Sequence, residues 1–389
     1  MYMAQKIELK IKKSQVEYLN QYFGYSRHIY NKSLDTWKEM YSLYKEDNSN
    51  VKPSHRKVRD VLKCCKEEWE ENLPKMILET ACEDLGKAYN MMWKNVGKYP
   101  KYKSKHKSKR TFRMYRKNEY TIQIKDNKNL KVTGIDFFLK MKEPLKIDGI
   151  IKEVTISNKG SKYYASFVVD TNEESFQIEN DLYCGIDLGI KDLAIINGDD
   201  GLFRKYHSII KKLRPLYEKI NYYNKSLSKK VKDSNKYNLT RTKLNNTYDR
   251  IVNIRNDYLH KITTNICTRY KYITIEDLKV SNLIKNKHLS KSIGNSCWYT
   301  FRSMLEYKSK MYNNTIIIAD RFFPSTQLCS NCGHVFVKEN KMTLKDRKYI
   351  CPDCGKIIDR DFNASTNLKE YGRRFMSLAN EGIKSFYKL

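Results

Sequence analysis

The chain has 389 residues. At about 150 residues per domain, this length suits two or three domains and excludes a single small binding module. Its 75 lysine and arginine residues against 44 aspartate and glutamate residues leave a formal net charge of +31. Such a charge repels itself unless a polyanion neutralises it, and nucleic acid is the polyanion that we expect. Hydrophobic residues make up 40% of the chain, which is enough for folded cores and excludes a disordered basic tail.

The sequence gives no sign of a membrane segment or a secretory signal. No apolar run approaches the roughly 18 residues that a membrane helix needs, and the beginning MYMAQKIELKIKK lacks the apolar stretch of a signal peptide. Four of the ten cysteines form two close pairs. In a reducing compartment, such pairs favour metal binding over disulfides, so we expect an intracellular protein with a metal site.

The first hundred residues are predicted to form one strand followed by helices. The string QKIELKIK alternates between apolar and polar residues as a half-exposed strand does. Apolar residues then recur at helical spacing from about Gln15 to Tyr44, and two more helical stretches fit residues 54–71 and 75–97. We therefore assign residues 1–13 to a strand and 14–97 to a helical segment.

A basic segment follows, from Lys98 to Lys117, with ten lysine or arginine residues in twenty positions and aromatic residues between them. Basic side chains neutralise phosphates and aromatic rings stack on bases, so we interpret this segment as a nucleic-acid contact. A solvated linker is the alternative. The candidate contact residues are Lys98, Lys101, Tyr102, Lys103, Lys105, Lys107, Lys109, Arg110 and Arg113.

Residues 120–125, 129–141 and 150–170 carry alternating or β-branched runs that are separated by turn residues. They predict a small antiparallel sheet or barrel. If the N-terminal strand joins this sheet, the helical segment is an insertion within one β domain, whose second part is 98–180. The acidic stretch TNEESFQIEND, at 171–181, is the predicted domain boundary.

The second half of the chain is predicted to mix strands and helices. Three strands, YCGIDL, DLAII and GLFRKY, precede a long helical region that fits two antiparallel helices. A fourth strand, YITIE, a helix around residues 297–311 and a fifth strand, TIIIAD, follow. The polar stretch at 279–295 is either a lid over a site or a passive loop.

The spacing of four cysteines predicts a zinc site. Cys329 and Cys332 are followed, after eighteen residues, by Cys351 and Cys354, which fits the pattern of tetrahedral zinc sites. A closed four-cysteine shell is structural, because it leaves no position open for water. Disulfides or free buried thiols are the alternative, and the nearby His334 is a possible but unneeded ligand.

Three carboxylates are candidates for a catalytic metal site. Asp187 and Glu276 each point away from the apolar face of a predicted strand, and Asp361 lies at a predicted helix start. Two Mg²⁺ ions that hydrolyse a phosphodiester need such oxygen ligands on rigid elements. Each acid taken alone is as easily a structural carboxylate. Asp359 is the nearest competitor for the role of Asp361.

Several segments together resemble one known family. The chain is similar to TnpB, a family of transposon-encoded RNA-guided nucleases of the OrfB type, related to miniature type V CRISPR effectors. In the second half, the resemblance is carried by GIDLGIKDLA, RNDYLHK, IEDL, HLSKSIGNSCWYTFRSMLEYK, RFFPSTQLCSNCG and CPDCGKIIDRDFNAS. In the first half, it is carried by RHIYN and YPKYKSKHKSKRTFR.

The resemblance implies a multidomain α+β fold. It implies an RNase H-like (RuvC) nuclease domain at 181–320 and 357–389, interrupted by a zinc ribbon at 321–356. The acids Asp187, Glu276 and Asp361 match the three metal-binding acids of that domain. The preceding residues would form a β-barrel wedge domain that carries a helical recognition insertion.

The resemblance also implies an activity, cofactors and partners. The expected protein is a Mg²⁺-dependent endodeoxyribonuclease of the bacterial cytoplasm, associated with the nucleoid; its oligomeric state is left open, with a monomer favoured. It would bind a guide RNA, read a short flanking duplex motif, pair the guide with the target strand and cut DNA at one RuvC site. Its DNA partners would be double-stranded and single-stranded target. We expect one structural Zn²⁺ and two catalytic Mg²⁺ ions. A catalytically idle RNA-guided repressor and a guide-independent structure-specific nuclease are the alternatives.

Overall fold

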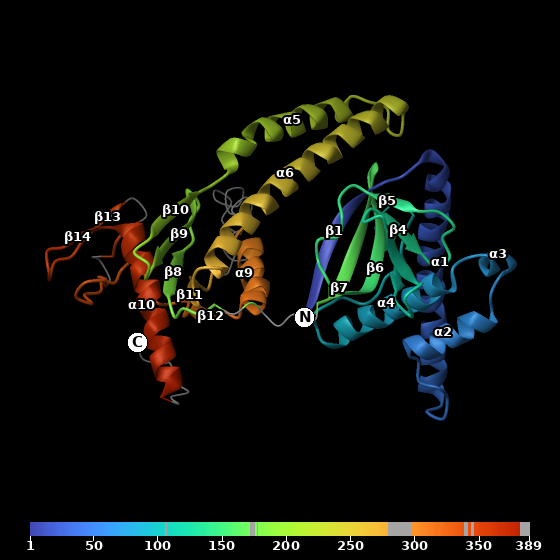
Figure 1. Ribbon diagram of the computed structural model, residues 1–389, viewed down its shortest axis with the longest axis horizontal. Helices are drawn as coiled ribbons and strands as arrows, with labels where there is room; N and C mark the ends of the chain where they lie inside the picture. The colour runs from blue at the N-terminus through green and yellow to red at the C-terminus, as the bar shows by residue number, and fades with distance from the viewer. Residues whose placement is uncertain are drawn as a thin grey trace. The chain divides into compact units, whose positions relative to one another are not determined.

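The computed structural model describes residues 1–105, 107–171, 176, 178–278, 297–337, 341–343 and 346–381. The chain forms two compact units, Met1–Glu174 and Ser175–Leu389, which divide within the acidic stretch 171–181 (Figure 1). The stretch 279–295, for which the sequence suggests a lid or a passive loop, lies outside the described residues. Among the helices of the described ranges, none is long and apolar enough to cross a membrane.

The N-terminal unit contains a seven-stranded antiparallel sheet with the order β2-β6-β7-β1-β5-β4-β3. Its strands are β1 (Tyr2–Lys10), β2 (Arg110–Tyr115), β3 (Ile122–Lys125), β4 (Asn129–Val132), β5 (Leu139–Met141), β6 (Ile150–Lys159) and β7 (Lys162–Asp170). The first strand lies between β7 and β5, so the helices that follow it are an insertion within one β domain, as expected. Since β2 and β3 are the two edges of this order, the backbone ladder does not itself close into a barrel.

Four helices lie between β1 and β2 in the chain: α1 (Lys13–Glu46), α2 (His55–Cys64), α3 (Glu68–Glu71) and α4 (Lys75–Trp93). The predicted helix at 54–71 is therefore divided in two. The division has a local cause, because the Glu70 carboxylate accepts a 3.0 Å hydrogen bond from the Glu67 backbone N–H and starts a new helix there. Apolar residues of α1 and α4 share one core with the sheet.

The C-terminal unit contains a five-stranded sheet with the order β10-β9-β8-β11-β12. The strands are β8 (Tyr183–Asp187), β9 (Asp192–Gly198), β10 (Phe203–His207), β11 (Tyr272–Glu276) and β12 (Thr315–Ala319). The pairs β8 with β11 and β11 with β12 are parallel, whereas β8 with β9 and β9 with β10 are antiparallel. The five strands predicted from the sequence are all present, and β8 and β11 lie side by side.

Four helices of the described ranges accompany this sheet. The helices α5 (Ile210–Ser228) and α6 (Asn235–Cys267) form a long antiparallel hairpin (Figure 1). The helix α9 (Trp298–Tyr312) packs on α6, and α10 (Arg360–Asn380) packs on β8, β9 and β11. A small hairpin of β13 (Lys348–Ile350) and β14 (Ile357–Asp359) lies immediately before α10. The C-terminal unit thus has a mixed α/β fold in which α10 follows the segment that contains the cysteine pairs.

Candidate functional site

Two of the candidate acids lie at the same level of the central sheet. Asp187 ends β8 and Glu276 ends β11, and these parallel strands pair in a register that sets Ile186 opposite Ile275. The next position along each strand is therefore Asp187 on one side and Glu276 on the other. Neighbouring strands are about 4.8 Å apart, so the two carboxylates extend from adjacent strand ends.

Two glycines let α10 approach the sheet closely. A Cβ atom at Gly185 in β8 would lie 2.1 Å from the Ser365 carbonyl oxygen of α10. A Cβ atom at Gly372 in α10 would lie 2.0 Å from the Thr274 Oγ1 atom of β11. Because only glycine permits this contact, the first turn of α10, which contains Asp361, is held beside the ends of β8 and β11.

The three carboxylates interact electrostatically. Burial raises the pKa of Asp187 well above its usual range, and the nearby charges of Glu276 and Asp361 raise it further. Burial also raises the pKa of Glu276. The Arg360 guanidinium, which is 3.1 Å from Asp361, partly offsets this accumulation of negative charge. A group of hard oxygen ligands that disfavours its own ionisation fits divalent cations such as Mg²⁺, because the cations neutralise it.

Asp359, the competing acid, has a different task. It is the N-cap of α10, and its carboxylate accepts hydrogen bonds from the backbone N–H groups of Asp361 and Phe362, at 3.1 and 3.0 Å. Its second interaction is an ion pair with Lys205, at 3.3 Å. The carboxylate of Asp359 is therefore occupied in starting the helix that carries Asp361.

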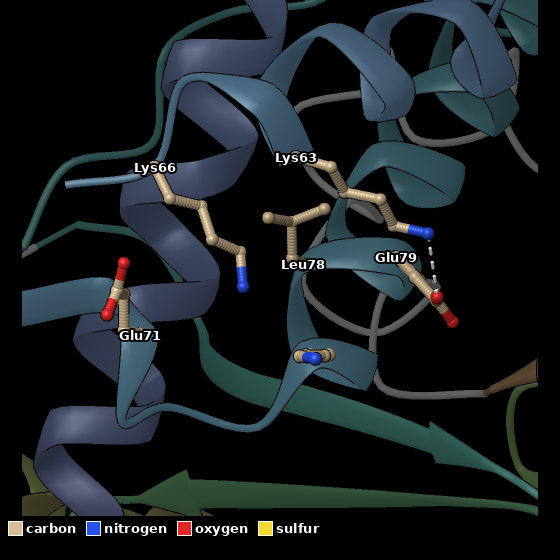
Figure 2. Close-up of a pocket in the computed structure, with 6 residues that line it drawn as sticks. Lys63, Lys66, Glu71, Leu78 and Glu79 are labelled. Carbon is tan, nitrogen blue, oxygen red and sulfur yellow. Dashed lines mark ion pairs between the residues drawn. The ribbon is translucent and has the colours of Figure 1, made fainter. Parts of the chain in front are cut away.

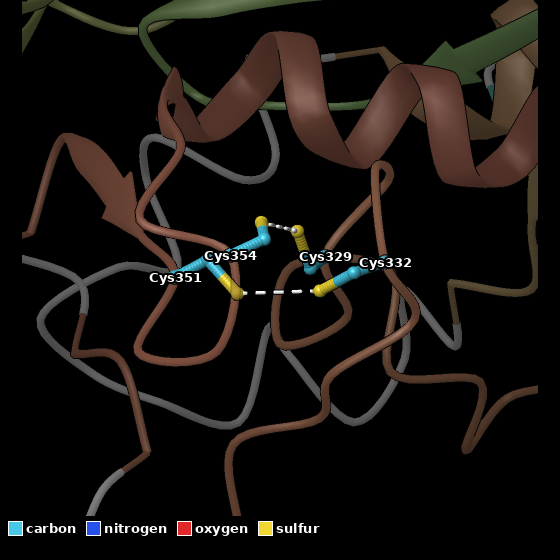
Figure 3. A group of neighbouring side chains, drawn as sticks. All are labelled: Cys329, Cys332, Cys351 and Cys354. Carbon is cyan, nitrogen blue, oxygen red and sulfur yellow. Dashed lines mark hydrogen bonds between the residues drawn. The ribbon is translucent and has the colours of Figure 1, made fainter.

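The four cysteines converge on one point, as Figure 3 shows. All four sulfur atoms lie within 4.8 Å of one another, with 3.9 Å between those of Cys329 and Cys354 and 3.4 Å between those of Cys332 and Cys351. The backbone N–H of Lys356 lowers the pKa of the Cys354 thiol to about 6. The pKa of Cys332 is raised instead, because hydrogen bonds with the other three cysteines outweigh the lowering effect of the His334 backbone. Across the described ranges, no other set of three or more histidines, cysteines or carboxylates lies close enough to form such a cluster. The set of Asp187, Glu276 and Asp361 does not form one either.

The cysteine pairs lie on two turns that end in left-handed glycines, Gly333 with φ +82° and Gly355 with φ +68°. Such turns direct both sulfur atoms of a pair to the same side. His334 takes no part in the cluster, because its Nδ1 atom is 2.8 Å from the Asp353 carboxylate. The arrangement fits one tetrahedral Zn²⁺ ion with a closed shell.

The basic segment divides into an exposed part and an engaged part. Exposed side chains belong to Lys98, Lys101, Lys105, Lys107, Lys109 and Arg110. The side chains of Tyr102 and Lys103 contact α1: the Tyr102 hydroxyl accepts a 2.7 Å hydrogen bond from the ammonium of Lys38, and the Lys103 ammonium lies 3.7 Å from the ring centre of Tyr30. The first set is available to phosphates, whereas the second set anchors the segment to the helix.

Arg113 has a structural position. Its guanidinium is buried and donates to Glu83 and Glu153, both at 2.7 Å, and to Asp84 at 3.1 Å. Three carboxylates therefore surround one guanidinium between α4, β2 and β6. We leave Arg113 out of the proposed nucleic-acid contacts, because its charge is already matched within the protein.

A basic pocket in the helical insertion is a second candidate site. Its volume is about 540 Å³, and Figure 2 shows the residues that line it. The lining consists of three lysines, two glutamates and one leucine: Lys63, Lys66, Glu71, Lys75, Leu78 and Glu79. The ammonium of Lys63 is paired with Glu79 at 3.2 Å. Because the lining has more ammonium groups than carboxylates, the pocket suits an anion. No sequence pattern had indicated this pocket.

Sequence reasoning also missed two residues at the carboxylate site. The Ser325 hydroxyl donates a 2.6 Å hydrogen bond to Glu276, and the Arg360 guanidinium contacts Asp361. Ser325 lies in a loop outside any strand or helix pattern, so only the three-dimensional contact identifies it. Arg360 directly precedes Asp361, and this proximity was the one available signal.

Three family models match parts of the chain. Residues 298–368 match the "Cas12f1-like, TNB domain", 166–287 match the OrfB family described as "Probable transposase", and 1–46 match its "Helix-turn-helix domain". In this structure, residues 1–46 form β1 and the single long helix α1.

Curated relatives are similar over most of their length. A candidate RNA-guided DNA endonuclease of Streptomyces pristinaespiralis is 30% identical over 79% of this chain and 73% of its own. The candidate RNA-guided DNA endonuclease InsQ of Escherichia coli (strain K12) is 26% identical over 80% of this chain and 77% of its own. A cryo-EM structure of a Cas12f1–sgRNA–target DNA complex has 13% identity and a TM-score of 0.36, over 95% of this chain and 99% of that chain.

Proposed function

Because the chain belongs to the TnpB family of transposon-encoded proteins, we propose that it is an RNA-guided DNA endonuclease. The single observation that carries the proposal is that Asp187 ends a strand beside the strand that ends in Glu276, and that its carboxylate interacts electrostatically with both Glu276 and Asp361. The arrangement of the elements also supports an RNase H-like (RuvC) assignment for residues 181–320 and 357–389. In it, β8 and β11 are parallel neighbours within the sheet, and α10 packs on both.

Asp187, Glu276 and Asp361 are the residues that would hold the catalytic Mg²⁺. When bound, two Mg²⁺ ions supply Lewis acidity and neutralise charge during phosphodiester hydrolysis. The protein contributes rigid placement of the ligands: Asp187 and Glu276 extend from strands of one sheet, and Asp361 is fixed by the capped start of α10. The Ser325 hydroxyl orients one oxygen of Glu276. The Arg360 guanidinium limits the repulsion between the acids before substrate phosphate arrives.

Other parts of the chain would bind nucleic acid. We assign the sheet of the N-terminal unit, residues 1–13 and 98–180, to the wedge domain, and 14–97 to the recognition insertion. The exposed lysines between Lys98 and Arg110 would contact phosphates of guide RNA or target DNA. Sequence specificity would come from pairing between the guide and the target strand, as in related effectors. We place the zinc ribbon at 321–356.

The decisive experiment compares Asp187→Ala with the native chain, each purified with its guide RNA. We expect the variant to retain the guide and to bind matched DNA, but to lose cleavage by at least about 1,000-fold, since one of the carboxylates that would hold Mg²⁺ is removed. Asp257→Ala is the matched control, because Asp257 is an exposed acid of α6 that forms an ion pair with Lys261 at 2.8 Å. Cleavage by the Asp187 variant at the native rate would refute the site.

A second arm of this experiment tests the guide. Cleavage of matched and unmatched DNA is measured with the co-purified RNA present and after its removal. We expect cutting only of matched DNA and only with the guide. Equal cutting without RNA would instead identify a guide-independent nuclease, and binding without any cutting by the native chain would identify an idle DNA-binding protein.

A further inference from the structure

Two asparagines of α10 form hydrogen bonds with the backbone beside the cysteine site. The carbonyl oxygen of Leu328, directly before Cys329, accepts hydrogen bonds from the side-chain amides of Asn363, at 2.6 Å, and Asn367, at 2.7 Å. The Oδ1 atom of Asn363 accepts a 2.9 Å hydrogen bond from the backbone N–H of Ser330, directly after Cys329. The backbone on both sides of this cysteine is therefore bound to α10.

The same network reaches the carboxylate site. The side-chain amide of Asn367 also donates to the carbonyl oxygen of Ser325, at 2.8 Å. The hydroxyl of Ser325 donates to Glu276, at 2.6 Å. Asn367 thus holds Ser325 and Leu328 at the same time, and the serine holds the metal-ligand acid.

Burial makes these hydrogen bonds consequential. Asn363, Asn367 and Ser325 are 0%, 3% and 5% exposed. A buried side-chain amide without a hydrogen-bond partner costs free energy. Moving the Leu328 carbonyl away from Asn363 and Asn367 is therefore unfavourable. Only three residues separate Ser325 from Cys329, which spans at most about 14 Å of extended chain. A displacement of the cysteine turn is therefore transmitted to Ser325.

We infer that Ser325, Asn363 and Asn367 are positioning residues through which zinc binding at the four cysteines sets the orientation of Glu276, and hence the affinity of the carboxylate site for divalent ions. The inference rests on the proposed function of the three acids. In this account, zinc holds Leu328 in place, and Leu328 is joined to Ser325 through the side-chain amide of Asn367. Ser325 then orients one carboxylate oxygen of Glu276 for metal binding.

The test measures Mn²⁺ binding to the full-length chain by electron paramagnetic resonance, in the absence of substrate. The Asp187→Ala variant defines the signal that belongs to the carboxylate site. We expect Ser325→Ala to weaken Mn²⁺ binding at this site about tenfold, the effect typical of an outer-shell hydrogen bond. Ser325→Thr keeps the hydroxyl and should restore native affinity. Thr326→Val, which removes the neighbouring hydroxyl, is the matched control and should bind Mn²⁺ as the native chain does.

A second arm acts from the zinc side. Zinc is removed from the native chain with a chelator, its loss is measured by mass spectrometry, and Mn²⁺ affinity is measured again after the chelator is removed. We expect the affinity to fall about tenfold or more and to recover when one equivalent of Zn²⁺ is restored. Asn367→Ala should weaken the response to zinc, because it disconnects Ser325 from Leu328.

The outcomes separate the inference from the proposed function. Native Mn²⁺ affinity in Ser325→Ala, or in the zinc-free chain, would overturn the inference and leave the nuclease proposal standing. A Ser325→Thr variant as weak as Ser325→Ala would also overturn it, since the hydroxyl would not be the cause. If the native chain binds no more Mn²⁺ than Asp187→Ala, the carboxylate site itself is wrong and both are rejected.

Discussion

The four-cysteine site and the three-carboxylate site are assembled in different ways. The cysteines lie within 26 positions of one another, from Cys329 to Cys354, and their sulfur atoms lie within 4.8 Å of one another. The acids come from residues 187, 276 and 361, and burial together with mutual repulsion raises the pKa of Asp187. One site is a local turn structure with a closed shell, whereas the other depends on strands and a helix that are far apart in the sequence.

This difference predicts what each site loses when one of its residues is replaced. Loss of a cysteine removes a metal that holds a small segment folded. Loss of an acid removes a charge that the fold tolerates only at a cost, so the fold should survive and the chemistry should not. Each prediction below breaks or sharpens this contrast, beginning with the largest expected effect.

Replacing one buried cysteine should unfold the cysteine segment. In Cys351→Ser, we expect zinc to fall from about one ion per chain to nearly none and residues 321–356 to lose amide protection, since zinc binding contributes roughly 10 kcal/mol to folding of such sites. Zinc content and hydrogen exchange measure this. Cys65→Ser, at an exposed cysteine outside the cluster, is the control. Full zinc retention in Cys351→Ser would contradict the four-cysteine assignment.

A methyl group between the sheet and α10 should disturb the carboxylate site more than the cysteine site. The Cβ atom of Gly185→Ala would lie 2.1 Å from a backbone oxygen, so we expect a loss of about 3 kcal/mol and a Tm lower by about 6 to 12 °C. Zinc content should persist. Gly24→Ala is the control, because a Cβ atom there meets nothing within 4 Å and alanine favours a helix by about 0.5 to 1 kcal/mol. Equal Tm changes would show that close contact with α10 is unimportant.

The carboxylate site should make the free energy of unfolding of the metal-free chain depend on pH. The pKa of Asp187 is raised in the folded chain but ordinary, near 3.9, in the unfolded chain. The folded state therefore binds more protons above about pH 4, and the free energy of unfolding decreases as pH rises toward the raised value. Asp187→Asn should flatten this decrease, and Mg²⁺ should oppose it. Urea unfolding in EDTA at several pH values measures both; parallel profiles for the two chains would refute the account.

The smallest effect should come from His334, the histidine beside the cysteine site. Because its ring nitrogen contacts Asp353, His334→Ala should leave zinc content unchanged and alter stability by no more than about 0.5 kcal/mol. Zinc analysis and thermal unfolding check this. A halved zinc content would show that the histidine shares in metal binding.

The sequence predicted the cysteine site more directly than the carboxylate site. The spacing of the cysteines is a local pattern that needs only two turns, so the pairs were identified without knowledge of the fold. Strand alternation indicated that Asp187 and Glu276 leave their apolar faces, but only the parallel register of β8 and β11 sets them side by side. Their selection from 44 acidic residues depended on the family resemblance.

Other features were beyond the sequence for physical reasons. The burial of Arg113 among three carboxylates depends on contacts between α4, β2 and β6, which a count of basic residues does not reveal. The break between α2 and α3 depends on one side-chain hydrogen bond of Glu70. Ser325 acquires its role from a contact with a residue 49 positions earlier, and no local pattern records such a pairing.

The placement of Asp361 on α10 has a consequence for the newly made chain. A ribosome that has released residues only as far as the second cysteine pair has already produced β8, β11 and the zinc ligands, yet the third acid is still inside the exit tunnel. Nascent and prematurely terminated polypeptides would therefore lack the third of the acids that we propose as Mg²⁺ ligands. Under the proposed function, DNA cutting would begin only after α10 has emerged and packed against Gly185.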